Sequence, residues 1–356
     1  MTPLILLGAG KIGETIAQFL HGSGDYTLTV ADQDPARLTP IAALGVKTTR
    51  ADFGDARVLA ALIGGNAMAI SACPFYLTPA IAQASVAVGA HYFDLTEDVE
   101  STRRVKALAA GAGTALVPQC GLAPGFISIL ARAMTRKFES LRDVQMRVGA
   151  LPVYPTNALM YNLTWSTDGL INEYCNPCEA IIDGNVRETL ALEEIEAFSL
   201  DGIGYEAFNT SGGLGTLCET LSGRVENLNY KTVRYPGHRD LVKMLIRDLR
   251  LGQRRELLKD VLEAAVPMTH QDVVLVFVTV SGMQDGRLTQ ESFAKKIYSN
   301  TLATRPYSAI QITTAAGVCA MVDLLREGAL PQRGFVRQED ADLERFLANR
   351  FGRHYA

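Results

Sequence analysis

The sequence predicts an α/β protein in which a doubly wound parallel sheet carries an inserted α+β domain. A glycine-rich turn, Gly8-Ala9-Gly10-Lys11-Ile12-Gly13, directly follows the apolar residues 2–7. The next apolar run ends in an acid, Asp32, and predicted strands and helices then alternate as far as residue 118. Strand, glycine turn, helix, strand and acid in this order are typical of a dinucleotide-binding domain of the Rossmann type.

Each glycine of the turn has its own role in this interpretation. Gly8 permits the tight bend from strand to helix, Gly10 lets the backbone approach a pyrophosphate, and Gly13 allows the helix to pack closely on the strand. The N–H groups at the start of the helix, at Lys11 and Ile12, would then face the phosphates. The turn is therefore the predicted cofactor site.

Asp32 favours NAD over NADP as the cofactor. Its carboxylate would accept hydrogen bonds from the ribose hydroxyls of the adenosine, and its negative charge would repel the extra phosphate of NADP. Arg37 and Arg50 keep NADP as an alternative cofactor, because a nearby guanidinium accommodates that phosphate.

The predicted sheet occupies the first third of the chain. Its strands cover residues 2–7, 26–31, 46–50, 67–72, 91–94 and 114–118, and helices are expected at 14–20, 35–44, 56–63, 77–89 and 102–111. Ligands of such sheets bind outside the carboxyl ends of the strands, so the residues that follow each strand are the candidate site. We expect further cofactor contacts at Asp52, Phe53, Cys73 and Pro74, and substrate-side residues at Tyr76, Asp94, Glu97 and Cys120.

The pattern changes after residue 122. Strand-like runs at 144–148 and 273–280 are separated by polar, glycine-containing stretches and by a charged helical segment at 239–265. From residue 305 the chain again predicts helix, with apolar residues at helical spacing. We expect a Rossmann domain at 1–122, an α+β domain at 123–304, and carboxyl-terminal helices at 305–356 that return to the first domain.

The composition is that of an ordinary globular protein. Of 356 residues, 48% are hydrophobic and 20% are charged, and the formal net charge is -4. This charge argues against a nucleic-acid partner, which calls for a basic surface. The apolar run at 273–280 is far shorter than the roughly 20 residues that cross a bilayer, and no basic segment precedes the first strand. We expect a soluble, cytoplasmic protein with no membrane partner.

The six cysteines lie mostly in apolar segments, which indicates buried side chains in a reducing compartment. Only Cys175 and Cys178 have the spacing of a metal or redox motif. Because neither a second cysteine pair nor a nearby histidine accompanies them, we expect a loop there and no metal site.

Three stretches of the second domain are richer in polar and aromatic groups than packing requires. They are residues 161–174 with the only tryptophan, Trp165; residues 207–217 with Thr210; and residues 231–238 with Arg234 and His238. Arg234 can hold a carboxylate through a forked pair of hydrogen bonds, and His238 titrates near neutrality, as a proton carrier does. The alternatives are an ordinary ion pair for Arg234, a helix cap for His238 and a core position for Trp165.

At these residues the chain resembles the superfamily of saccharopine dehydrogenase (glutamate-forming) and lysine 6-dehydrogenase, and the lysine 6-dehydrogenases most. The resemblance covers nearly the whole chain, with its motifs at residues 8–13, 121–125, 164–171, 208–213 and 231–238. It implies a Rossmann domain completed by the carboxyl-terminal helices, and an inserted substrate domain through which family members usually form homodimers. It also implies NAD(P)-linked oxidation at an amine-bearing carbon.

For the lysine enzyme, the resemblance implies that L-lysine and NAD give 2-aminoadipate 6-semialdehyde, ammonia and NADH, with cyclisation of the aldehyde to a piperideine carboxylate. The protein must then hold the substrate and deprotonate its amine. We expect Asp94 or Glu97 to attract the amino groups and His238 to transfer the proton. Substrate contacts are expected at Tyr76, Cys120, Trp165, Thr210 and Arg234, the last binding the α-carboxylate.

Two other functions stay open. A saccharopine-type reductase would condense an amino acid with an aldehyde and reduce the imine, and Asp32 argues mildly against it because that reaction commonly draws on NADPH. A non-catalytic NAD-binding sensor would leave the polar stretches of the second domain without a use.

Overall fold

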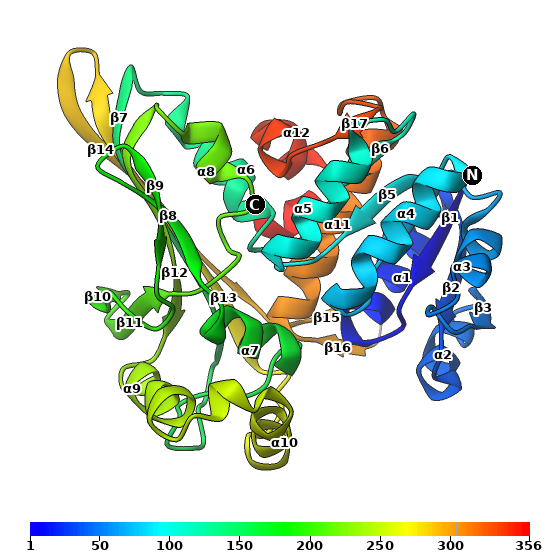
Figure 1. The fold of residues 1–356 in the computed structure, drawn as a ribbon, viewed down its shortest axis with the longest axis horizontal. Helices are drawn as coiled ribbons and strands as arrows, with labels where there is room; N and C mark the ends of the chain where they lie inside the picture. The colour runs from blue at the N-terminus through cyan, green and yellow to red at the C-terminus, as the bar shows by residue number, and fades with distance from the viewer. Residues whose placement is uncertain (303–304) are drawn as a thin grey trace. The chain divides into compact units, whose positions relative to one another are not determined.

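The structure is a computed structural model that describes residues 1–302 and 305–356. The described chain forms two compact units, one of Met1–Ile129 with Gln311–Ala356 and the other of Leu130–Ile310. Each unit has a large sheet of its own (Figure 1).

The first unit contains a seven-stranded sheet in the order β17-β6-β5-β4-β1-β2-β3, with every neighbouring pair parallel. The strands are β1 (Thr2–Leu7), β2 (Tyr26–Asp32), β3 (Lys47–Arg50), β4 (Met68–Ser71), β5 (His91–Asp94), β6 (Ala115–Val117) and β17 (Gly334–Phe335). The strand order reverses between β1 and β4, which is the switch point of a doubly wound sheet. This topology confirms the predicted Rossmann-type α/β fold, although the short β17 was not expected.

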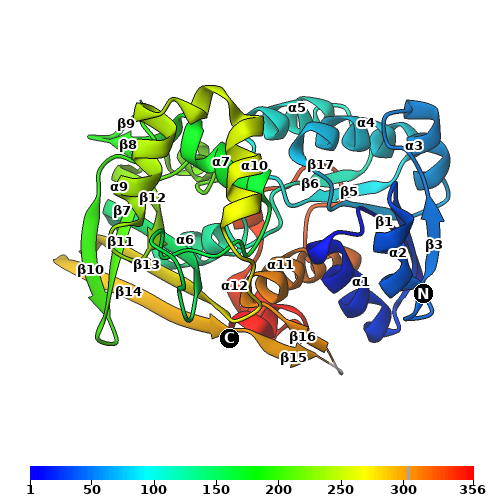
Figure 2. The same cartoon turned by 90° about the horizontal axis from the view of Figure 1, so that it is seen from below.

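Helices cover both faces of this sheet (Figure 2). One face carries α3 (Ala56–Ile63), α4 (Thr78–Val88) and α5 (Val99–Ala109), which supply Leu59, Ile81 and Val105 to an apolar core. The other face carries α1 (Lys11–Ser23) and α11 (Ala309–Arg326). The remaining helical segments are α2 (Pro35–Ala42), α12 (Leu343–Ala348), η1 (Phe75–Leu77), η4 (Gln338–Asp340) and η5 (Gly352–Tyr355).

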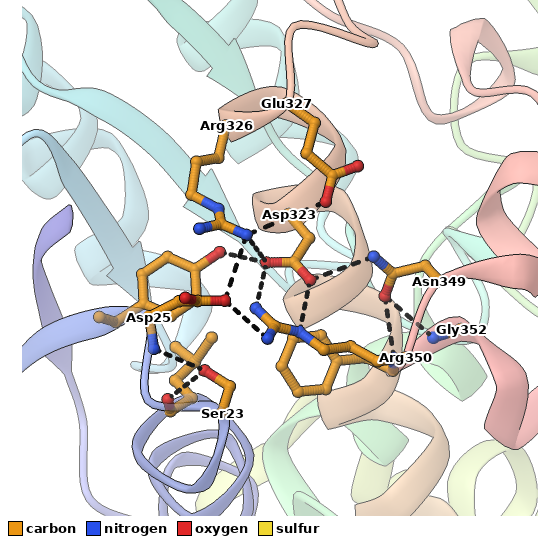
Figure 3. A network of polar contacts seen from close by, with 11 residues as sticks. Ser23, Asp25, Asp323, Arg326, Glu327, Asn349, Arg350 and Gly352 are labelled. Carbon is orange, nitrogen blue, oxygen red and sulfur yellow. Dashed lines mark hydrogen bonds and ion pairs between the residues drawn. The ribbon is translucent and has the colours of Figure 1, made fainter. Parts of the chain in front are cut away.

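Helix α11 is long and apolar enough to cross a membrane by length and composition, but 83% of it is buried inside the structure. It is accordingly a core helix of the first unit. Its buried carboxylate Asp323 belongs to a polar network that ties the carboxyl-terminal residues to the start of β2 (Figure 3). Asp323 accepts hydrogen bonds from two nitrogens of Arg350, at 2.8 and 3.0 Å, and from the hydroxyl of Tyr26. Arg350 also pairs with Asp25 at 2.7 Å.

The second unit contains an eight-stranded mixed sheet with the path β10-β11-β12-β7-β13-β14, and β8 and β9 attached through β12. The strands are β7 (Ser140–Pro152), β8 (Cys178–Ile182), β9 (Asn185–Thr189), β10 (Glu196–Leu200), β11 (Ile203–Asn209), β12 (Val225–Arg234), β13 (Asp272–Gln284) and β14 (Arg287–Tyr298). Only β12 and β7 pair in parallel. This mixed sheet confirms the predicted α+β character. The predicted strand runs 144–148 and 273–280 lie within β7 and β13, and the other strands of this sheet were not predicted.

The helices and remaining strands are α6 (Phe126–Thr135), α7 (Thr167–Cys175), α8 (Leu217–Leu221), α9 (His238–Lys243), η2 (Met244–Asp248), η3 (Leu251–Gln253), α10 (Arg255–Ala265), β15 (Asn300–Leu302) and β16 (Arg305–Tyr307). The charged segment expected to be helical, residues 239–265, is helical over most of its length, but it is divided into α9, the π-helical η2, the short η3 and α10. Arg250 ends the first run, since its φ of 57° lies in the left-handed region.

The helices α7, α9 and α10 pack together against the sheet. Apolar side chains from all three join Phe208 of β11 in one core, including Tyr174, Val242 and Leu258. This core surrounds the residues that the sequence analysis singled out in the second domain.

Candidate cofactor and substrate sites

The glycine turn joins β1 to α1, and its three glycines have different surroundings. Gly8 has a φ of +104°, and a Cβ there would lie 2.6 Å from the carbonyl oxygen of Ala72. A Cβ at Gly13 would lie 2.0 Å from the carbonyl oxygen of Gly8, whereas a Cβ at Gly10 would meet nothing within 4 Å. Gly8 and Gly13 are thus required by packing. Gly10 instead leaves the start of the helix uncovered.

The amino terminus of α1 has no side-chain cap, because its N-cap residue is Gly10. Lys11 is exposed and Ile12 is half-buried beside it. The positive end of a helix dipole attracts anions, and here no capping side chain of the N-cap residue stands in the way. These residues therefore fit a pyrophosphate.

Asp32, at the end of β2, contacts this turn directly. Its Oδ2 accepts a hydrogen bond from the backbone N–H of Ala9 at 2.7 Å, and its Oδ1 accepts one from Asp34 at 2.8 Å. The side chain is buried, with 4% of the residue exposed. A fixed carboxylate thus lies at the carboxyl edge of the sheet, where the sequence analysis expected the ribose.

Arg37 and Arg50, the two arginines considered for the extra phosphate of NADP, have partners within the protein. Arg50 donates from Nε to the carbonyl oxygen of Gln33 at 3.2 Å. Arg37 pairs with Asp34 at 3.5 Å, and both of these side chains are exposed. Exposed pairs of this kind are weak, so Arg37 is held only loosely.

The other expected cofactor residues have differing environments. Asp52 is exposed and accepts the N–H of Gly54 at 2.9 Å, whereas Phe53 is buried in the core between sheet and helices. The Cys73 thiol donates to the carbonyl oxygen of Leu7 at 3.3 Å, and burial raises its pKa to about 12. Pro74 precedes η1. Tyr76 is 66% exposed.

Asp94 and Cys120 lie at neighbouring strand ends in the first unit. Oδ1 of Asp94 accepts the N–H groups of Thr96 at 3.0 Å and Gln119 at 2.8 Å. Burial raises the pKa of Asp94 to about 6, although these two N–H groups oppose the shift. The backbone N–H of Cys120 donates to the carbonyl oxygen of Asp94 at 2.8 Å, and its thiol is fully buried. Glu97 is half-buried in the loop before α5.

Arg234 and His238 come together in the second unit through a residue that the sequence analysis did not single out, Tyr174. Nε of Arg234 donates to the Tyr174 hydroxyl oxygen at 2.9 Å, and the same oxygen lies 3.0 Å from Nε2 of His238. Nδ1 of His238 lies 2.8 Å from the carbonyl oxygen of Leu159. The aromatic ring of Tyr161 faces the Arg234 guanidinium, 4.9 Å from Cζ to the ring centroid.

The Arg234 guanidinium is a buried cation on which the carboxylate of Glu173 acts through its charge. Arg234 is 2% exposed, and in the part of the chain that the structure describes it forms no ion pair. Its Nη1 donates to the carbonyl oxygen of Val233 at 2.8 Å and to Thr232 at 3.4 Å, and among the described residues its Nη2 has no hydrogen-bond partner.

Arg147, on the neighbouring strand β7, shows the usual arrangement for a buried arginine. It is 3% exposed and pairs with the carboxylate of Glu196, which also pairs with Lys231 at 3.1 Å. An arginine stays protonated in proteins, and a buried charge without a partner is unfavourable. Arg234 differs from Arg147 in that, among the described residues, it forms no ion pair.

Glu206, and not His238, caps the amino terminus of α9. The Glu206 carboxylate accepts the N–H groups of Gly237 at 2.8 Å and Arg239 at 2.6 Å. His238 is instead 1% exposed, and burial together with the Arg234 cation lowers its pKa to about 3. A histidine in this state is neutral near pH 7.

Trp165 and Thr210 lie at the edges of this region. Trp165 is half-buried and packs against the core of α7, α9 and α10. Thr210 directly follows β11 and is 3% exposed, and its hydroxyl has no partner among the described residues. The signal for Tyr174 was its aromatic, polar side chain in the stretch 161–174, but only the fold shows that it faces Arg234.

Two family models together match most of the chain. Residues 4–117 match the family model described as "Saccharopine dehydrogenase NADP binding domain", and residues 121–353 match "Saccharopine dehydrogenase C-terminal domain". The structure of apo histidine-tagged saccharopine dehydrogenase (L-Glu forming) from Saccharomyces cerevisiae is similar with a TM-score of 0.81 at 16% sequence identity, covering 98% of this chain and 97% of that one. At such identity the likeness shows the fold alone.

Two curated relatives are much longer. "Alpha-aminoadipic semialdehyde synthase, mitochondrial" from Bos taurus is 20% identical over 314 residues, which are 84% of this chain and 33% of that protein. The protein of the same name from Rattus norvegicus is 20% identical over 191 residues, or 51% of this chain and 21% of that protein. The chain therefore spans at most a third of the curated relatives that it matches.

Proposed function

The chain belongs to the saccharopine dehydrogenase family, and from this premise we propose that it oxidises the amine-bearing carbon of an amino acid with a nicotinamide dinucleotide. L-Lysine is the proposed substrate and NAD the proposed cofactor. Lysine, NAD and water would give 2-aminoadipate 6-semialdehyde, ammonia, NADH and a proton, and the aldehyde would cyclise to a piperideine carboxylate. The name of the bovine relative refers to this same semialdehyde.

The observation that carries the proposal is the buried Arg234 cation, which has no ion pair within the described residues. A carboxylate held by Arg234 through its Nη2 edge would compensate the charge and form a strong, charge-assisted hydrogen bond. An α-amino acid supplies such a carboxylate. The half-buried side chain of Trp165 adds apolar surface for the aliphatic part of the substrate.

The cofactor half of the proposal depends on the glycine turn and Asp32. The uncapped start of α1 would hold the pyrophosphate, and the carboxylate of Asp32 would accept the ribose hydroxyls and disfavour an added phosphate. When bound, the nicotinamide ring supplies the two-electron acceptor of the reaction.

The substrate amine needs a group that attracts it and takes its proton. Asp94 suits this role chemically, because its pKa of about 6 places it between the charged and neutral forms near physiological pH. Glu97, in the adjoining loop, is the second candidate. His238 is unsuited to proton transfer near neutral pH, since its pKa is lowered to about 3.

A saccharopine-type reductase is the second candidate function. The descriptions of the two matching family models favour it, since both name saccharopine dehydrogenase. The product of such a reductase carries two amino-acid moieties. Its binding site therefore needs a further group for a second carboxylate.

One assay separates these candidates. The protein is incubated with NAD or NADP and a panel of amino acids and diamines while NADH absorbance is followed. A second set contains reduced cofactor, an aldehyde and glutamate. Turnover of lysine with NAD supports the first proposal, and turnover that requires both aldehyde and glutamate supports the reductase. Cofactor binding without any turnover would overturn both and favour a sensor.

We also propose that the protein is a homodimer formed through its second unit. Phe198, Tyr235 and Phe277 are only half-buried on one face of the second sheet, with Phe198 and Phe277 5.7 Å apart. Ile203 is 43% exposed nearby in sequence, at the start of β11. An Ile203→Glu variant should lower the mass measured by light scattering from two chains to one. The matched variant Val186→Glu on β9 should leave it at two, and a monomeric wild-type protein would contradict the proposal.

A further inference from the structure

The hydrogen bonds around His238 have directions that the chemistry of the partners fixes. The carbonyl oxygen of Leu159 can only accept, so Nδ1 of His238 carries the proton and donates at 2.8 Å. At the other end, Nε of Arg234 can only donate, so the Tyr174 oxygen accepts at 2.9 Å. The Tyr174 hydroxyl hydrogen remains available for Nε2 of His238, 3.0 Å away.

The side chains that face His238 keep its second nitrogen unprotonated. The ring centroids of Tyr161, Tyr174 and Phe208 lie 5.2 to 6.3 Å from that of His238, and the Phe208 ring is stacked nearly parallel to the imidazole, at 11°. Arg234 is the charged group that acts on it, and burial and this cation both lower the pKa of His238. Protonation of Nε2 would place a second positive charge beside the guanidinium in a site with little solvent.

We infer that His238 is a positioning residue, which accepts the hydroxyl hydrogen of Tyr174 and so fixes the plane of the Arg234 guanidinium for binding a carboxylate. The chain of bonds runs in one direction, from Arg234 through Tyr174 and His238 to the Leu159 carbonyl. It holds the guanidinium at Nε, while Val233 holds Nη1. The Nη2 edge is then left in a defined orientation.

This assignment departs from the proton carrier that the sequence suggested for His238. Because the imidazole sits at the end of the bond chain and is 1% exposed, it reaches the substrate only through Tyr174 and Arg234. Part of the inference rests on the proposed function, namely that an amino-acid carboxylate occupies the Arg234 site. The tautomer of His238 does not.

Two variants of His238 separate its nitrogens. In His238→Gln, the amide reaches the position of Nε2 and keeps an acceptor for Tyr174. In His238→Asn, the shorter amide mimics Nδ1, keeps the bond to Leu159 and loses the acceptor. We expect the Asn variant to weaken L-lysine binding about tenfold, and the Gln variant to retain most of the affinity. Binding is followed by the fluorescence of Trp165, the only tryptophan, in the full-length protein saturated with NADH, which cannot accept a hydride from lysine.

A double-mutant cycle tests whether His238 acts through Tyr174. Tyr174→Phe should weaken L-lysine binding by a similar factor, and adding His238→Asn to that variant should have no further effect, because the two residues form one chain. Independent, multiplicative losses would overturn the inference. So would a loss of kcat at unchanged KM in His238→Asn, together with loss of one limb of the pH profile, because those are the signatures of a proton carrier.

A third measurement needs neither activity nor a stable variant. In wild-type protein labelled with ¹⁵N-histidine, His238 should show a protonated Nδ1 and an unprotonated Nε2 from pH 5 to pH 9. Titration in this range, or the opposite tautomer, would overturn the inference. If lysine causes no change in the Trp165 signal of the wild type, the proposed substrate fails while the NMR result still decides the tautomer.

Discussion

The Tyr174 hydroxyl oxygen lies 2.9 Å from Nε of Arg234, and it thereby positions a buried cation that forms no ion pair among the described residues. A guanidinium that is fixed in orientation and forms no ion pair suits a planar anion such as a carboxylate. Several measurable consequences depend on this arrangement and on the glycine turn of the first unit.

Replacing Arg234 by glutamine should raise KM for the amino acid about thirtyfold or more, because a charge-assisted hydrogen bond contributes roughly 2–3 kcal/mol. The affinity for NAD should not change. The KM of Arg234→Lys should lie between that of the wild type and that of Arg234→Gln, since lysine keeps the charge and loses the fork geometry. Steady-state kinetics provides the measurement. Arg187→Gln, at an exposed position of β9, is the control and should behave like wild type. An unchanged KM in Arg234→Gln would contradict the substrate assignment.

The two glycines Gly10 and Gly13 should respond differently to alanine. A Cβ at Gly10 meets no atom within 4 Å, so Gly10→Ala should keep the wild-type Tm and weaken NAD binding at least tenfold by blocking the approach of the phosphates. A Cβ at Gly13 would lie 2.0 Å from the Gly8 carbonyl oxygen, so Gly13→Ala should lower Tm itself. Thermal unfolding and calorimetric titration with NAD check both. Equal Tm losses in the two variants would show that Gly10, too, serves only packing.

Asp32→Ala should weaken NAD binding more than NADP binding. The substitution removes the acceptor for the ribose hydroxyls and also the charge that repels the extra phosphate of NADP. A lower Tm is expected as well, because the carboxylate bridges the N–H groups of Ala9 and Asp34. The dissociation constants of both cofactors should be measured below the unfolding temperature. An unchanged ratio between them would remove Asp32 from the ribose site.

Asp94 should impose a pH dependence on stability. Burial raises its pKa in the folded protein to about 6 from an ordinary value of 3.8. A raised pKa means that its contribution to stability is fully present below about pH 4 and is lost as pH rises through about 6. Asp94→Asn removes this pH-dependent contribution to stability and keeps an acceptor for the N–H groups of Thr96 and Gln119. The unfolding free energy of the variant minus that of the wild type should therefore rise between pH 4 and 7, by up to about 3 kcal/mol. A flat difference would show that the carboxyl is solvated in the folded state.

The Rossmann sheet was predictable because its signals are local. A strand, a glycine turn and an acid at fixed spacing report the geometry of one loop, and the apolar runs of β1 and β4 report burial on both faces. β17 escaped prediction because Gly334–Phe335 contributes only two residues to the sheet. The strand signals of β14 were also weak, since its alternation of exposed and half-buried residues lacks a fully buried face.

The second-unit site was predictable only in part. Arg234 and His238 stood out by residue type, but β12 carries Arg234 while Tyr174 comes from α7, and only tertiary packing brings these elements together. The neutral protonation state of His238 was not predicted, because its pKa depends on burial and on the Arg234 cation rather than on sequence neighbours.

The polar network at the carboxyl terminus should contribute to the stability of the first unit. Asp323 is 1% exposed, and Arg350 holds it through two nitrogens while also pairing with Asp25. Arg350→Ala leaves Asp323 with Tyr26 and Arg326, so part of the compensation survives. We expect a loss of about 1–3 kcal/mol in unfolding free energy, measured by urea denaturation. Arg353→Ala removes an exposed arginine from the same segment and should change stability by less than about 0.5 kcal/mol. Equal effects of the two variants would mean that the loss comes from helix propensity at the chain end rather than from the Arg350–Asp323 pair.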